Sequence, residues 1–196
     1  MIVIVDYRAG NLTSVKKAFD SMGVSSVVTR DPDAVAQADK IVLPGVGHFS
    51  ATATLEETGL RAAILQRLKQ GVPFLGICVG MQWMFDSSTE APSTSGAALL
   101  AGRCERFPSS VKSPHVGWNS LVCDGRSLLL REIPSGSFVY FTHSYRAPLV
   151  AATVARTEYG GGFSAAIEQD HLFGVQFHPE KSGHIGIRLL QKFCAL

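Results

Sequence analysis

The sequence contains no long run of apolar residues and no recognisable export signal. No apolar stretch approaches the ~18 residues that a membrane-spanning helix needs. Residues 1–6 include neither a basic leader nor a cleavage site of small residues, so they do not match a signal peptide. We therefore expect a chain that neither spans a membrane nor is exported, and that works in the cytoplasm.

Charge and cysteine are both sparse. Only 17% of the residues are charged, the formal net charge is +2, and Lys and Arg are scattered among Asp and Glu. A nucleic-acid-binding surface would need clustered basic residues, so no such partner is expected. The four cysteines (78, 104, 123 and 194) are far apart and form no Cys-x-x-Cys pair. We expect reduced thiols, with no metal and no cofactor.

The chain does have ample apolar material for a buried core. Its 196 residues, 46% of them hydrophobic, suit a single domain spanning residues 1–196. In the first half, apolar segments alternate with segments of helical periodicity. The predicted strands are 2–5, 24–29, 40–43 and 72–77, and the predicted helices are 11–22, 60–70 and 79–85. This alternation predicts an α/β fold with a mostly parallel central sheet and helices on its faces.

The second half changes to short strands separated by turns. Residues 87–96 are rich in Ser, Thr, Pro and Gly and are predicted to form a loop. The predicted strands that follow are 102–107, 117–122, 137–141, 151–157, 163–168 and 172–176, before a helix at 184–193. We therefore expect extra antiparallel strands late in the chain.

Cys78 lies in the sequence GICVG at residues 76–80, between a predicted strand and a predicted helix. A sharp strand-to-helix turn lifts a nucleophile above the sheet edge, and small flanking residues let the backbone bend. The positive end of the helix dipole favours the reactive thiolate. The backbone N–H of Val79 is then the natural donor to an oxyanion. A buried packing cysteine in a glycine-rich turn is the alternative for this segment alone.

His178 and Glu180 have the spacing of a general base and its orienting carboxylate. They stand in the sequence FHPE at residues 177–180, directly after a predicted strand. A residue before proline favours extended backbone, in which side chains two positions apart point to the same side. Glu180 is therefore expected to orient the His178 imidazole. A surface histidine beside a surface glutamate is the alternative, and the other five histidines are expected to be surface or structural residues.

A glycine-rich turn, LPGVGH, follows the predicted strand that ends at residue 43. Such a turn can present backbone N–H groups to an anion. Taken by itself, this segment is better explained as an ordinary loop between a strand and a helix.

Together these segments resemble the class I, or triad, glutamine amidotransferases. GICVGMQ at residues 76–82 is similar to the nucleophile segment of that family, FHPE to its His/Glu segment, and PGVG at residues 44–47 to its oxyanion loop. The resemblance implies a flavodoxin-like fold with helices on both faces of the sheet. It also implies that Cys78 forms a thioester with the side chain of L-glutamine, while His178 transfers protons and Glu180 orients it.

The resemblance further implies roles for residues around the bound glutamine. The oxyanion would be bound by backbone amides of Val79, Gly45, Val46 and Gly47. The substrate would be held by Gly47, Gln82, His143, Ser144 and Tyr145.

Three other segments narrow the resemblance to the glutaminase subunits of imidazole glycerol phosphate synthase. They are DYRAGNL at residues 6–12, HVGWN at 115–119 and YFTHSY at 140–145. This implies a heterodimer with a cyclase subunit, a β/α barrel that receives the ammonia in histidine biosynthesis. Asn11, Trp118 and Lys181 match positions near that partner.

Two alternatives stay open. One is the glutaminase of another synthase, such as pyridoxal phosphate synthase, against which the segments at 115–119 and 140–145 argue. The other is a non-catalytic scaffold of the same fold, against which the presence of all three triad residue types argues. Association with a barrel partner tests the first, and labelling of Cys78 by a glutamine-mimicking electrophile tests the second.

Overall fold

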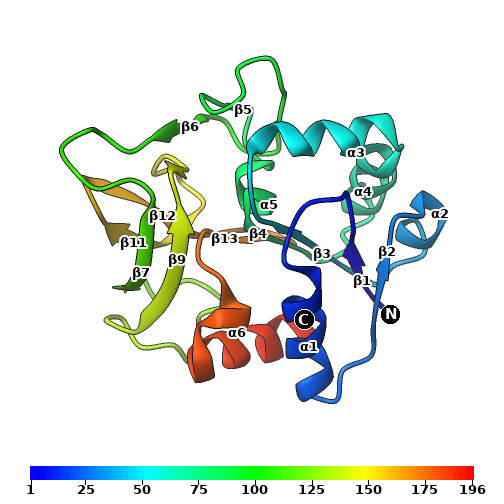
Figure 1. Ribbon diagram of the computed structural model, residues 1–196. Helices are drawn as coiled ribbons and strands as arrows, with labels where there is room; N and C mark the ends of the chain where they lie inside the picture. Colours follow the sequence, from blue (N-terminus) through cyan, green and yellow to red (C-terminus); the bar gives the residue numbers. More distant parts are fainter.

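A large mixed β-sheet runs through the computed structural model, which describes all of residues 1–196 (Figure 1). Its strands are β1 (Ile2–Val5), β2 (Ser26–Thr29), β3 (Lys40–Gly45), β4 (Phe74–Cys78), β8 (Val122–Cys123), β11 (Thr153–Glu158), β12 (Gly162–Gln169) and β13 (Leu172–Val175). Their order is β2-β1-β3-β4-β13-β12-β11-β8. Neighbours from β2 to β13 are parallel, and those from β13 to β8 are antiparallel. The predicted flavodoxin-like parallel sheet with late antiparallel strands is therefore confirmed.

Helices cover both faces of this sheet (Figure 1). On one face lie α1 (Leu12–Ser21) and α6 (Gly183–Ala195), and on the other lie α2 (Pro32–Val35), α3 (Ala53–Glu57), α4 (Leu60–Lys69) and α5 (Val79–Gln82). Short 3-10 helices occur at η1 (Phe49–Thr52) and η2 (Pro179–Lys181). No helix has both the length and the apolar content needed to cross a bilayer.

The alternation of side chains along β1 explains the two-sided packing. Ile2 and Ile4 belong to the core beneath α1 and α6, whereas Val3 and Val5 belong to the core beneath α4. Successive side chains of a strand point to opposite faces, so a strand buried on both faces is apolar throughout. This is why the continuous apolar run at the start of the chain predicted a buried strand.

Two small sheets extend the fold beside the antiparallel end. One is a ribbon of β7 (His115–Ser120) and β9 (Phe138–His143), and the other contains β5 (Ser87–Ser88), β6 (Arg103–Arg106) and β10 (Tyr145–Arg146). The prediction of one strand over 117–122 is wrong. Buried Leu121 separates β7 from β8, and its N–H donates to the carbonyl of Ser137. The predicted loop at 87–96 also contains β5, which pairs with β6.

The predicted helix at 79–85 is wrong beyond Gln82. The carbonyl groups of Trp83, Met84 and Phe85 accept hydrogen bonds from the segment at 97–100. Because those acceptors are used by a distant segment, the helix stops after a single turn. The helix that follows Cys78 is therefore short.

Two glycines permit the tight turn between β4 and α5. A Cβ atom at Gly80 would lie 1.8 Å from the carbonyl oxygen of Leu43, and one at Gly76 would lie 2.6 Å from the carbonyl oxygen of Gly80. Real Cβ atoms do not approach so closely, so glycine is required at both positions. The turn therefore depends on the absence of these side chains.

We expect Gly80→Ala to lower the free energy of unfolding by roughly 3 kcal/mol or more, because the added methyl group meets fixed backbone. Gly125→Ala is the matched control. Gly125 has φ +82, but no atom lies within 4 Å of the place where its Cβ would stand, so only about 1–2 kcal/mol of backbone strain is expected. Denaturant unfolding of both variants measures the difference, and equal losses would contradict the packing argument.

Candidate active site

Cys78 ends β4 at the carboxyl edge of the parallel strands, and α5 begins with the next residue. Its backbone has φ 53° and ψ −108°, an unusual conformation for a residue other than glycine. Gly45, the last residue of β3, is its partner in the β3–β4 register. The strained conformation is the sharp strand-to-helix turn expected of a nucleophile.

His178 and Glu180 lie together, although not in the predicted way. Nδ1 of His178 is 2.9 Å from Oε1 of Glu180, and each side chain is only 1% exposed. The expected extended backbone holds for His178 alone, since Pro179 and Glu180 form the 3-10 turn η2. The hydroxyl of Ser182 donates to the carbonyl of His178 and accepts from the N–H of Tyr140. These bonds tie the turn to β9.

The surroundings of His178 favour its charged form. Burial opposes the charge, but interactions with Cys78 and Glu180 outweigh burial and raise the pKa of His178. Nε2 of His178 makes no hydrogen bond of normal geometry, even though Cys78 is near enough to affect it. Active-site hydrogen bonds are often long until substrate is bound. This nitrogen therefore remains available for proton transfer.

A cavity of about 220 Å³ opens beside Cys78. Eight of the residues predicted from the sequence line it: Val46, Gly47, Cys78, Val79, Gln82, His143, Ser144 and Tyr145. Gly45 is buried beside Cys78 in the sheet and does not line the cavity. His178 and Glu180 are buried and do not line the cavity.

Three lining residues were not predicted from the sequence: Glu90, Pro114 and Thr142. Glu90 carried a usable signal, since it is the only acidic residue in the Ser/Thr-rich segment at 87–96. Its carboxylate accepts a hydrogen bond from the N–H of Phe49, which fixes it at the cavity. Pro114 and Thr142 gave no comparable signal in the sequence.

Two predicted substrate-binding residues also support the fold around the cavity. The carbonyl of Tyr145 accepts hydrogen bonds from Nε2 of Gln82 and from Nδ1 of His143, each at 2.8 Å. Burial lowers the pKa of His143 to about 3, so its ring is neutral at ordinary pH. Within this cavity His143 is therefore a polar group and not a cation.

Two of the three predicted interface residues lie beside the same aromatic ring. Trp118 is 55% exposed and packs edge-on against Tyr140, whose ring lies 5.9 Å from Nζ of exposed Lys181. Asn11 is the N-terminal cap position of α1, which contacts η2, and its side chain makes no capping bond. Trp118 and Lys181 thus both lie beside Tyr140, and Asn11 directly precedes the helix that contacts the turn carrying Lys181.

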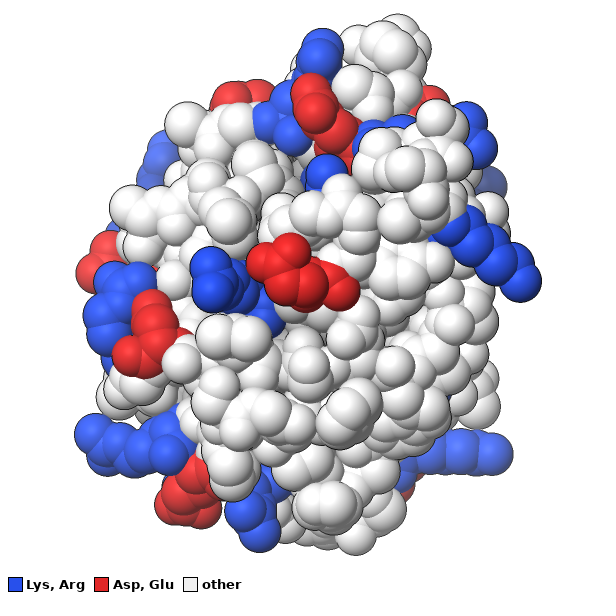
Figure 2. All heavy atoms as spheres, turned by 90° about the vertical axis from the view of Figure 1, so that its left-hand side faces the viewer, with Lys and Arg blue, Asp and Glu red and all other residues white.

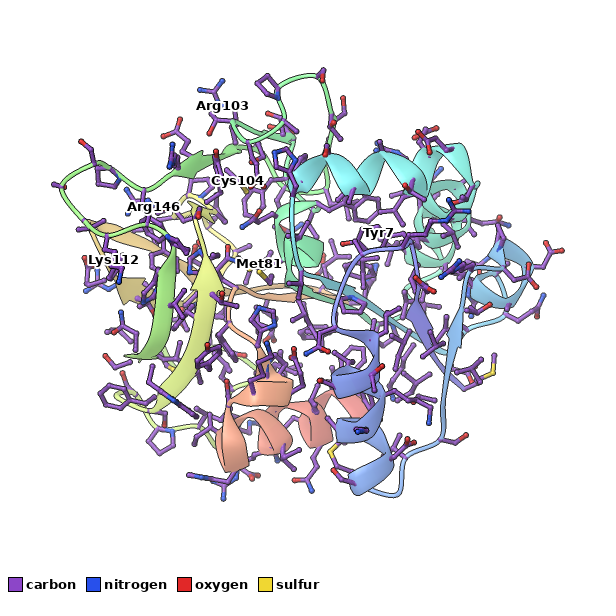
Figure 3. The ribbon with its side chains drawn as sticks, viewed as in Figure 1. Tyr7, Met81, Arg103, Cys104, Lys112 and Arg146 are labelled. Atoms are coloured by element: carbon purple, nitrogen blue, oxygen red, sulfur yellow. The ribbon has the colours of Figure 1, made fainter.

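A larger hollow of about 490 Å³ lies elsewhere, lined in part by Arg103 and Arg146 (Figure 3). Both arginine side chains already have partners within the protein. Arg103 pairs with Glu105, and the guanidinium of Arg146 donates to the carbonyls of Gly160 and Gly161. No nucleophile lies in its lining, so size alone does not mark it as the active site.

The chain belongs to the class-I glutamine amidotransferase family, whose model matches residues 3–195. It is a glutamine-hydrolysing enzyme of that class. It is 47% identical over 195 residues to the imidazole glycerol phosphate synthase subunit HisH of Methanothermobacter thermautotrophicus, covering 98% of this chain and 97% of the relative. The subunit HisH of Moorella thermoacetica is 44% identical, with 98% and 93% covered.

Solved structures show the same fold at low sequence identity. A glutamine amidotransferase crystal structure superposes with a TM-score of 0.78 at 18% identity, covering 100% of this chain and 98% of the other. PurLQS from Thermotoga maritima gives a TM-score of 0.76 at 20% identity, with 99% and 97% covered. These proteins therefore share the fold although their sequences are only 18–20% identical to this chain.

We expect Glu180→Gln to lower kcat/KM for glutamine by on the order of 10²–10⁴-fold. The amide oxygen can still accept from Nδ1 of His178, so geometry is kept while the negative charge is lost. Because that charge helps to raise the pKa of His178, its removal lowers this pKa, and the imidazolium is lost at lower pH. The alkaline limb of the pH–rate profile should move to lower pH. An unmoved limb would contradict this role of Glu180.

Proposed function

We propose that the chain is the glutaminase subunit of an imidazole glycerol phosphate synthase. It hydrolyses L-glutamine and passes the ammonia to a cyclase subunit in histidine biosynthesis, in the cytoplasm. The observation that carries this proposal is 43–47% identity to relatives named imidazole glycerol phosphate synthase subunit HisH, over nearly the full length of both chains. The position of Cys78 beside His178 and the cavity supports the chemistry.

The first half of the reaction releases ammonia. The thiolate of Cys78 attacks the side-chain amide carbon of glutamine and forms a C–S bond, which places negative charge on the former carbonyl oxygen. The C–N bond then breaks as Nε2–H of His178 protonates the nitrogen. Ammonia leaves, and a γ-glutamyl thioester remains on Cys78. Glu180 keeps Nδ1 of His178 protonated and directs Nε2 at the reacting atoms.

The second half hydrolyses the thioester. His178, now neutral, takes a proton from water, and the hydroxide attacks the thioester carbon. Collapse of this second intermediate breaks the C–S bond and releases glutamate and the thiolate. The backbone N–H of Val79 and those of the loop at 45–47 would stabilise both oxyanions. Each such donor contributes on the order of 10²–10³ in rate.

Recognition of the amino-acid end of glutamine would fall to the remaining cavity groups. Both N–H bonds of the Gln82 amide are already used, by the carbonyl of Tyr145 and by Oε1 of Gln176. Its Oε1 is therefore left to accept from the α-ammonium group. Backbone and side-chain groups of Gly47, Ser144 and Tyr145 would bind the α-carboxylate, while neutral His143 keeps Tyr145 in place.

The partner would dock on the side bearing Trp118. Val116, Trp118 and Phe138 on the β7–β9 ribbon are more than half exposed. The view of this side in Figure 2 shows a broad uncharged area on its right, with the charged residues gathered mainly elsewhere. An exposed apolar patch of this kind is typical of a protein–protein interface. Lys181 on η2 lies close to it, beside Tyr140, and Asn11 directly precedes α1, which contacts η2.

We expect Cys78→Ala, assayed with the cyclase, to abolish glutamine-dependent synthesis while leaving synthesis from added ammonia close to the wild-type rate. The cyclase needs only ammonia, and the nucleophile is the only group removed. The control is Cys123→Ala, which changes a half-buried thiol outside the cavity and should leave both rates unchanged. Loss of both reactions in Cys78→Ala would contradict the division of labour.

We also expect the isolated chain to hydrolyse glutamine much more slowly than the complex with cyclase and its ligand. Val46 and Gly47 are exposed, and the space at the Cβ position of Gly47 is open, so few contacts hold this loop in the free chain. Steady-state glutaminase assays with and without partner measure the ratio. Equal rates would rule out control by the partner.

A further inference from the structure

We propose that Gln176 is a positioning residue for the nucleophile, which it holds through a hydrogen bond to sulfur. Nε2 of Gln176 lies 3.5 Å from Sγ of Cys78, and both residues are buried. Gln176 follows β13 and precedes the His178 turn, outside the triad and outside the cavity lining. This inference rests on the proposed role of Cys78. It adds a hydrogen-bond donor to the sulfur, whereas the donors of the thioester mechanism bind the oxyanion.

The direction of this hydrogen bond is fixed by the carbonyl of Tyr145. A carbonyl oxygen can only accept, so the Gln82 amide must turn its NH₂ group toward it. The same nitrogen, Nε2 of Gln82, uses its second hydrogen to donate to Oε1 of Gln176, at an N···O distance of 3.1 Å. Gln176 therefore has to present its oxygen to Gln82, and its own NH₂ group is left facing Cys78. Rotating either amide by 180° would set like groups against each other in a buried space.

The carbonyl of Tyr145 also determines which ring nitrogen carries the proton in two buried histidines. Nδ1 of His143 must donate to Tyr145, which leaves Nε2 of His143 as an acceptor for Nδ1–H of His115 at 3.2 Å. Nε2 of His115 then accepts from the amide of Asn119 at 3.3 Å. Burial lowers the pKa of His115 to about 4, in keeping with a pair of neutral rings. A continuous set of hydrogen bonds thus links Asn119 on β7 to Cys78, and its donors from the two sides converge on the carbonyl of Tyr145.

The chemistry of sulfur makes this donor useful. A hydrogen bond to a thiolate is charge-assisted and stronger than one to a thiol or thioester. Gln176 therefore stabilises Cys78 most when it is charged, before attack and as the leaving group of thioester hydrolysis. The helix behind Cys78 is only four residues long, so its dipole is small and a side-chain donor matters more.

The test is the pH dependence of Cys78 alkylation by iodoacetamide, read on the Cys78 peptide by mass spectrometry. In Gln176→Met, which keeps length but removes the donor, we expect the pH of half-maximal rate to rise by about one to two units. The matched control, Gln70→Met, changes an exposed glutamine at the end of α4 and should leave the profile unchanged. Alkylation needs no glutamine turnover, so this proposal and the proposed function can fail separately.

Two further measurements separate positioning from a merely structural role. With cyclase present, Gln176→Met should lower kcat and leave KM for glutamine nearly unchanged, since Gln176 does not line the cavity. In the unsubstituted protein, the side-chain amide protons of Gln176 should shift in NMR spectra as Cys78 ionises, and should not shift in Cys78→Ala. This spectrum decides the matter if Gln176→Met does not fold. An unchanged alkylation profile, or amide signals indifferent to Cys78, would overturn the proposal.

Discussion

The close contact between α5 and β3 sets the geometry of the whole site. The backbone at Gly80 lies against the carbonyl of Leu43, in a space where no side chain fits. A Cβ atom at neighbouring Gly45 would lie 2.5 Å from the hydroxyl of Tyr7 and 2.6 Å from Cβ of Val79. These contacts hold Cys78 in its strained conformation and place Val79 beside Gly45, at the start of the loop proposed to bind the oxyanion. The strain at the nucleophile is thus supported by close-packed backbone on both sides.

Three buried histidines differ in protonation because their electrostatic surroundings differ. His115 and His143 have no carboxylate partner, so burial keeps their pKa low and their rings neutral. His178 is buried to a similar degree, but Glu180 and Cys78 raise its pKa. Partners of opposite charge therefore distinguish the imidazole that is proposed to transfer protons from two neutral imidazoles that take part only in hydrogen bonds. This pattern supports the assignment of acid–base chemistry to His178.

Local sequence predicted those parts of the molecule that local physics determines. The apolar run at 72–77 and the glycines around Cys78 were enough to predict a buried strand and the turn after it. Helix 79–85 was predicted too long because distant residues 97–100 take its carbonyl groups. The His178–Glu180 contact was predicted correctly, yet η2 and not an extended chain brings it about. Gln176 was predicted only as a strand residue, since its role depends on Gln82 and Tyr145, which are distant in sequence.

The β7–β9 ribbon lies outside the central sheet, and His115 and His143 face each other across it in register. A small ribbon opens at a lower free energy than the sheet that carries β4 and β13. Local opening would break the hydrogen bonds that join Tyr140 on β9 to His178 and Ser182, and so would remove a support of the triad. The fraction of competent enzyme is then governed by the ribbon's own opening equilibrium and not by global stability. A protein bound over Trp118 would shift that equilibrium toward the closed ribbon through binding energy alone.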